Sequence, residues 1–107
     1  MIADEVVVIM VTAAALFTTG VYCLTSRSNV IRMVMGIELL GKGASLLFIL
    51  GGYLAGDTAI SQAVVITLIA IEAVVAGLAL ALVVRLNRGW KTLDIVAISR
   101  IASRGER

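Results

Sequence analysis

Residues 60–84, ISQAVVITLIAIEAVVAGLALALVV, decide the fold, because this run of 25 residues carries a single charge, Glu72. At about 1.5 Å per residue, a helix of that length spans about 38 Å, whereas the hydrocarbon core of a bilayer is about 30 Å thick. Of all 107 residues, 61 % are hydrophobic and 15 % are charged, and the mean hydropathy is +1.10. A soluble chain this short cannot bury so much apolar surface. The sequence therefore predicts an integral membrane protein.

Two further apolar stretches precede this run, at about residues 6–24 and 30–53. A polar break at 25–29 separates the two stretches, and the turn Gly56-Asp57-Thr58 precedes the third. Since none of them alternates like a strand, helices are the economical interpretation. We expect an all-α membrane protein with a single domain, 1–107, whose transmembrane helices cover about 6–24, 30–53 and 60–84 and whose tail is 85–107.

A cleaved signal peptide is the alternative interpretation of the first stretch. Such a peptide begins with a basic segment, whereas this chain has Asp4 and Glu5 there. We therefore expect the first stretch to remain as a helix.

The distribution of basic residues predicts the orientation in the cell (plasma or inner) membrane. The first loop holds Arg27, with Arg32 just inside the next helix, whereas the second loop holds Asp57 and no basic residue. Since cytoplasmic loops are enriched in Lys and Arg, we expect the N-terminus outside and the C-terminus in the cytoplasm. Six more basic residues follow the third helix: Arg85, Arg88, Lys91, Arg100, Arg104 and Arg107.

Glu38 and Glu72 are carboxylic acids near the middle of the second and third predicted helices. A charged side chain at that depth costs about 2.5–3.5 kcal/mol on insertion scales. A buried carboxyl group resists ionisation, so it can take up and release a proton near the working pH. The alternative is that each Glu only pairs with a neighbouring helix. A short turn joins helices two and three, so we expect the two acids at similar height on antiparallel neighbours.

Lys42 follows Glu38 by four residues, the spacing at which an acid and a base share a helix face. We expect these two side chains to pair. A movable Lys could shift the proton affinity of the carboxylate, or the pair could simply be neutral and lower the cost of insertion. The sequence leaves both interpretations open.

Several kinds of site are excluded by composition. The chain has no histidine and one cysteine, Cys23, which we interpret as a packing residue near a helix end. Disulfides, histidine-based metal sites and iron–sulfur clusters are therefore not expected. No nucleotide-binding glycine loop is present, and the basic residues do not cluster with aromatics as nucleic-acid binding requires. We expect no catalytic site, no metal and no cofactor in this chain.

Small residues in the second and third helices predict close helix packing. The tail carries apolar residues among basic ones, which predicts an interfacial or partner-docking segment, with a frayed tail as the alternative. The small residues are Gly36, Gly41, Gly43, Ala44 and Ser45, and then Ala73, Gly77 and Ala81; the tail residues are Trp90, Lys91, Leu93, Ile95, Val96, Ile98, Arg100 and Ile101.

With Met35-Gly36-Ile37-Glu38-Leu39-Leu40 in one helix and Ala70-Ile71-Glu72-Ala73 in the next, the chain resembles the K subunit of proton-pumping NADH:quinone oxidoreductase, respiratory complex I. The C-type subunits of multisubunit Na+/H+ antiporters belong to the same group. The resemblance covers nearly the whole chain, including Arg85-Leu86-Asn87-Arg88 and Leu93-Asp94-Ile95. It implies partners in the membrane, namely antiporter-like subunits and those of a quinone or hydrogenase module.

In that family the two glutamates line a hydrated lateral path, so the resemblance implies a proton-handling role for Glu38 and Glu72. Two features depart from the K subunits. Lys42 stands where Asn is often found, and residues 61–67, SQAVVIT, look more like the C-type antiporter subunits, which usually lack a carboxylate at the position of Glu72. This mosaic is similar to K/C-type subunits of membrane-bound hydrogenases.

We therefore expect a small subunit of a redox-driven ion pump or antiporter, with Glu38, Glu72 and Lys42 in its proton path. Two alternatives from other classes are a homo-oligomeric multidrug or cation exporter, a type with four spans, and a structural assembly subunit with inert glutamates.

Overall fold

The computed structural model describes residues 2–26 and 28–104, so Arg27 and Arg107, two of the basic residues used for the orientation, lie outside the described residues. Its helices, in chain order, are α1 (Ile2–Ser26), α2 (Val30–Ala55), α3 (Thr58–Trp90) and α4 (Ile95–Ser103). The first three are long and apolar enough to cross a membrane. The predicted fold class, an all-α protein with three membrane-spanning helices, is confirmed.

Polar caps define the ends of α2 and the start of α3. The Asn29 side chain accepts hydrogen bonds from the backbone N–H groups of Ile31 and Arg32, at 2.9 and 3.4 Å. Gly56 ends α2 with a φ of 74°, a conformation that favours glycine. Asp57 then caps α3 by accepting from the Ile60 N–H. The polar residues of the predicted breaks thus turn the chain between spans.

The third helix is longer than its apolar run. It has 33 residues and continues past Val84 to Trp90, where Lys91 leaves the helix with a φ of 56°. At about 1.5 Å per residue it measures about 50 Å, which exceeds the about 30 Å of hydrocarbon. Arg85 and Arg88 lie in the part of α3 that follows the apolar run.

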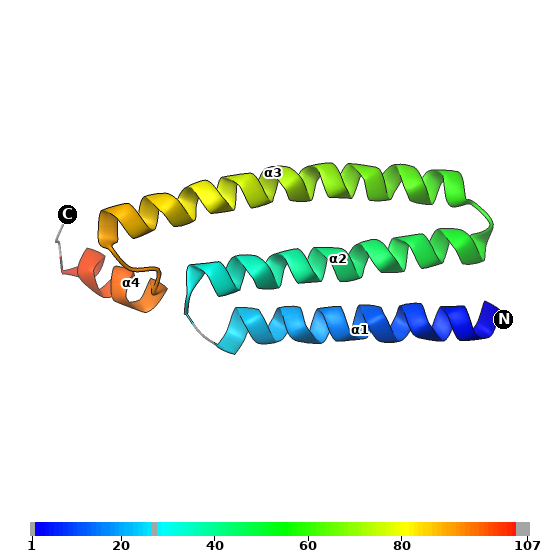
Figure 1. The fold of residues 1–107 in the computed structure, drawn as a ribbon, viewed down its shortest axis with the longest axis horizontal. Coiled ribbons are helices and arrows are strands. Elements are labelled where there is room, and N and C mark those ends of the chain that lie inside the picture. The colour runs from blue at the N-terminus through cyan, green and yellow to red at the C-terminus, as the bar shows by residue number, and fades with distance from the viewer. Residues whose placement is uncertain (1, 27, 105–107) are drawn as a thin grey trace.

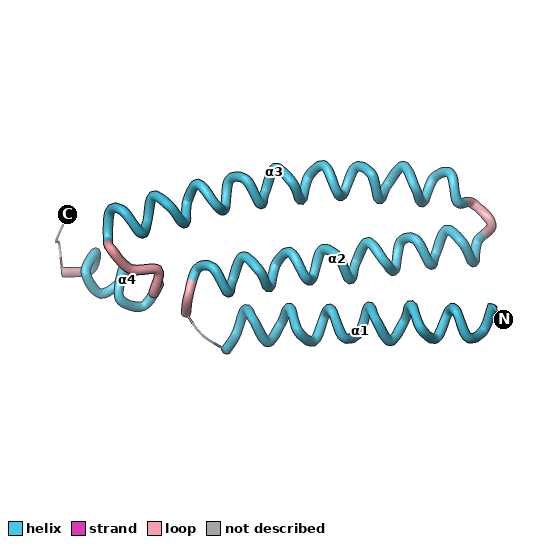
Figure 2. The backbone as a smooth tube through the Cα atoms, in the orientation of Figure 1, coloured by secondary structure: helices cyan, strands magenta, loops and turns pink. Residues whose placement is uncertain are grey.

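The three long helices form a single flat layer with α2 in the middle (Figures 1 and 2). They run antiparallel in sequence order, so the N-terminus lies at the same end as the α2–α3 turn. The α1–α2 connection and α4 lie at the opposite end. The described molecule measures 59 × 25 × 17 Å.

Two glycines bring α1 and α2 into backbone contact. A Cβ atom on Gly36 would lie 2.7 Å from the Gly20 carbonyl oxygen, and one on Gly20 would lie 2.9 Å from that of Gly36. Gly43 similarly lies against the ring of Phe17. In lipid, where no hydrophobic effect drives helices together, such close approach gains van der Waals contact. The predicted packing role of Gly36 and Gly43 is confirmed.

At the α4 end, the segment before α2 pairs with the segment before α4. The Val30 N–H donates to the Leu93 carbonyl at 3.0 Å, and the Ile95 N–H donates to the Ser28 carbonyl at 2.8 Å. The Ser28 hydroxyl also donates to Asp94 Oδ1 at 2.7 Å. We call these three hydrogen bonds the latch. Because of the latch, α4 is tied to the start of α2, and this part of the tail is a helix rather than a frayed end.

Most of the apolar surface of the layer is not covered by this chain. In α3 only 6 % of its most apolar 18-residue window is buried, and large side chains such as Ile66 and Leu78 are each 68 % exposed. Exposed apolar surface of this extent requires lipid or other membrane subunits.

Candidate ion path between α2 and α3

Close contact between α2 and α3 begins near their connecting turn. The Ser61 hydroxyl donates to the Phe48 carbonyl at 2.7 Å, and its Cβ fills the space that a side chain on Gly52 would occupy. Ser61 is also one of the few buried polar residues. This contact fixes the antiparallel register in which the charged residues meet further along the two helices.

In that register, Lys42 of α2 forms an ion pair with Glu72 of α3. Lys42 Nζ lies 2.6 Å from Glu72 Oε2. The Glu72 side chain is 15 % exposed, whereas that of Lys42 is 53 % exposed, so the lysine reaches over the surface of the layer to a largely covered carboxylate. Since Glu72 is the midpoint of the 60–84 run, the pair lies near the middle of a segment long enough to cross a membrane.

Gly41 provides the space for this carboxylate. A Cβ atom on Gly41 would collide with Glu72 Oε1 and would lie 2.9 Å from Glu72 Cδ. The carboxyl group therefore rests against the backbone of α2, one residue before Lys42. The sequence predicted Gly41 only as one of several small packing residues, and its specific role needed the interhelix register.

Glu38 lies one helical turn from Lys42 on the same face of α2. The two side chains line one open groove of about 420 Å³ between α2 and α3, together with Val34, Met35, Leu39, Ala76 and Leu80. Glu38 is half-buried there. The expectation that Glu38 and Lys42 share a face is thus correct.

The expected pairing of Glu38 with Lys42 is wrong. The one ion pair within the described residues joins Lys42 to Glu72. Spacing within one helix predicts that Glu38 and Lys42 are neighbours, but it does not predict whether an acid on another helix binds the lysine instead. Glu72 does so because α3 packs against α2 at Gly41. Glu38 makes no ion pair within the part of the chain that the structure describes, so the three groups carry a net charge of −1 when all are ionised.

Other predicted features lie away from this cluster. Cys23 is half-buried on α1, in keeping with a packing residue. Ala73, Gly77 and Ala81 are exposed, and a side chain on Gly77 would meet nothing within 4 Å, so these small residues pack no helix of this chain. No group of three metal-ligating side chains occurs among the described residues.

Ser61, Gly20 and the latch were not singled out from the sequence. Gly20 and Gly36 lie on different helices, so no spacing rule connects them. Asn29 and Asp94 each cap a helix, and the pairing between their segments depends on the tertiary structure.

Comparison with known proteins identifies the family. Residues 8–102 match the model of the NADH-ubiquinone/plastoquinone oxidoreductase chain 4L family. This chain belongs to that family. It is 39 % identical over 94 residues to NADH-quinone oxidoreductase subunit K of Chromohalobacter salexigens, an alignment that covers 86 % of this chain and 89 % of the relative.

Two further subunit K relatives show similar coverage. Subunit K 1 of Geotalea uraniireducens is 39 % identical over 87 residues, covering 80 % of this chain and 84 % of the relative. Subunit K of Ectopseudomonas mendocina is 37 % identical over 91 residues, covering 83 % and 86 %. The resemblance to subunit K expected from the glutamate-bearing helices is confirmed, and the matched region contains Glu38, Lys42 and Glu72.

Proposed function

We propose that this chain is a membrane subunit of a redox-driven, proton-translocating quinone oxidoreductase and that Glu38, Lys42 and Glu72 form part of its proton path. The observation that carries the proposal is the ion pair between Lys42 and Glu72, with Glu38 in the adjoining groove. The chain performs no bond-making chemistry in this role. It supplies groups that bind and release protons within the membrane.

The chemistry of the cluster supports this role. Lys42 has two carboxylates within its neighbourhood and pairs with one of them. A carboxylate beside an ammonium stays ionised, whereas the same group in an apolar groove without that cation favours its protonated form. Movement of Lys42 away from Glu72 would therefore promote proton uptake there, and its return would promote release.

Other subunits must complete the path. Three helices in a single layer cannot enclose a route for protons, and lipid is a poor neighbour for Glu38 and Lys42 in an open groove. We propose that membrane subunits of the same complex, antiporter-like or belonging to the quinone module, cover the α2–α3 groove and continue the path.

We further propose that the latch end faces the cytoplasm of the cell membrane and that the N-terminus faces outward. Arg85, Arg88, Lys91 and Arg100 lie at or near the latch end, whereas Asp57 lies in the turn at the other end. Cysteine labelling with an impermeant reagent tests this, because a Cys in the 56–57 turn should react from outside the cell and one near Arg104 should not.

The test of the path is Glu72→Gln in the assembled complex. The variant keeps the shape of the side chain and removes its acid, so we expect normal assembly and a severalfold lower proton translocation per electron transferred. Inside-out membrane vesicles report translocation by dye quenching and electron transfer by substrate oxidation. A structural subunit with inert glutamates predicts that both remain at the level of the unmodified complex.

The composition of the native assembly tests the choice of complex. We expect mass spectrometry of the purified assembly to find the subunits of a quinone-reducing module, in keeping with the names of the relatives. Hydrogenase subunits or an antiporter set would instead favour a complex of the kind that residues 61–67 resemble. Replacing Na+ with K+ in the vesicle assay would show which ion is transported.

A further inference from the structure

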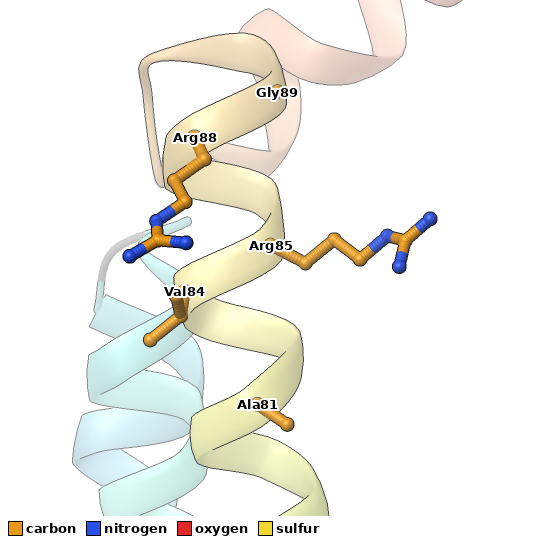
Figure 3. Close-up of a pocket in the computed structure, with 5 residues that line it drawn as sticks. All are labelled: Ala81, Val84, Arg85, Arg88 and Gly89. Atoms are coloured by element: carbon orange, nitrogen blue, oxygen red, sulfur yellow. The ribbon is translucent and has the colours of Figure 1, made fainter.

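A hollow of about 500 Å³ lies on the exposed surface of α3, away from the proposed proton path (Figure 3). Ala81, Val84 and Gly89 line it, and Arg85 and Arg88 flank it. We propose that this hollow binds the headgroup of an anionic phospholipid.

The position of the hollow along α3 matches the depth of a phospholipid phosphate. The apolar run ends at Val84, and Arg85 is the first charged residue after Glu72. Arg85 and Arg88 lie within about 6 Å of the end of the apolar run along the helix axis. This is the boundary between hydrocarbon and headgroups, where basic residues attract anionic lipids.

The two arginines are available for an anion. Neither makes an ion pair or a side-chain hydrogen bond with any residue in the ranges 2–26 and 28–104. Asp94, the closest acid to them in sequence within those ranges, accepts from the Ser28 hydroxyl and the Val96 N–H. Their side chains extend in different directions from α3 (Figure 3), and both arginines line the hollow. Guanidinium groups bind phosphate oxygens with paired hydrogen bonds.

The apolar surface next to the hollow favours a lipid over a free anion. Leu78, Ala81 and Arg85 recur at the spacing of one helix face, and Leu78 and Leu82 are 68 % and 53 % exposed. A side chain on Gly89 would meet nothing within 4 Å, so the headgroup has room beside the arginines. Acyl chains can therefore lie along this apolar helix face while the phosphate contacts the arginines at the end of the face. Inorganic phosphate has no apolar part that could bind to this helix face.

The test compares two double variants of equal charge in the complex that contains this chain. Arg85→Gln with Arg88→Gln removes the proposed site, whereas Arg100→Gln with Arg104→Gln removes the same charge from α4 and its end. Each complex is equilibrated with nanodiscs of phosphatidylglycerol and phosphatidylcholine, and bound lipid is counted by native mass spectrometry. We expect the first variant to retain one phosphatidylglycerol fewer than the unmodified complex and the second to retain the same number.

Equal retention by both variants would overturn the proposal, as would displacement of the lipid by inorganic phosphate in the wash. A photo-crosslinking residue identifies the occupant directly, through Ala81→p-benzoylphenylalanine in native membranes. We expect a phospholipid adduct on this chain. An adduct to another polypeptide would show that a partner protein, not a lipid, covers the hollow.

Discussion

At the scale of single residues, Gly41 has a specific role, because the absence of a side chain there provides the space for the Glu72 carboxyl group. Gly41→Ala would force Glu72 away from α2 and lengthen its contact with Lys42. We expect a severalfold loss of coupled proton translocation with the complex still assembled, measured as for Glu72→Gln.

Gly51→Ala is the matched control for this prediction. Gly51 lies on the same helix, and a Cβ there would meet nothing within 4 Å. Since alanine favours a helix over glycine by about 1 kcal/mol, the control should be neutral or stabilising. A loss of coupling in the control that equals the loss in Gly41→Ala would show that the effect comes from α2 as a whole and not from the carboxylate.

Lys42→Ala tests the ion pair from the other side. Without the ammonium, the Glu72 carboxylate loses its paired cation, so the pH profile of coupled transport should move. Lys42→Arg keeps the charge and should leave most of the profile in place. An unmoved profile in Lys42→Ala would indicate a lysine that only neutralises charge during insertion.

The identity of the acids and the base at this site was predictable, but the partner of the base was not. Glu38 and Glu72 are conspicuous because ionisable groups within apolar runs are costly. The choice of Lys42 between them depends on a helix register that is fixed about three turns away, where Ser61 packs against Gly52. Sequence spacing within one helix carries no information about that register.

At the scale of helices, the contact between α1 and α2 depends on Gly20 and Gly36. A Cβ atom on Gly36 would lie only 2.7 Å from the Gly20 carbonyl oxygen. Gly36→Leu would therefore place a large side chain where there is no space for it. Overpacking of this kind costs about 1–3 kcal/mol or more, so we expect less of the assembled complex on a native gel. Gly77→Leu serves as the control for this chain's own packing, because Gly77 has open space around it.

The helices themselves could be predicted from hydropathy, but the end of α3 could not. α3 passes the last residue of its apolar run and stops only at Trp90, because a membrane boundary does not interrupt backbone hydrogen bonding. The ends of α2 follow local chemistry, Asn29 at one end and Gly56 at the other, and both residues lie in breaks visible in the sequence.

At the scale of the whole molecule, the latch holds α4 against the start of α2. The hydrogen bond from the Ser28 hydroxyl, assisted by the Val96 N–H, lowers the pKa of Asp94 below its ordinary value of 3.8. A lowered pKa in the folded state means that the ionised carboxylate stabilises the latch above pH 3.8. This contribution is lost as the pH falls below 3.8 and through the pKa of the folded state.

Asp94→Asn should therefore weaken the latch at neutral pH and remove this acid dependence. Trypsin cleavage after Arg100 reports the opening of α4, and we expect faster cleavage at pH 7 in the variant. Asp57→Asn removes the charge of a comparable helix cap at the opposite end of the layer and should leave that rate unchanged. Equal cleavage of Asp94→Asn and the unmodified chain would show that the backbone hydrogen bonds hold the latch without the carboxylate.

The single layer of helices determines how neighbouring proteins can share this chain. Neighbours bound to its two broad sides would both face α2 and α3, the helices that the ion pair joins. In the proposed role, a proton held there lies close to both neighbours, so the chain would serve as a partition through which they exchange it.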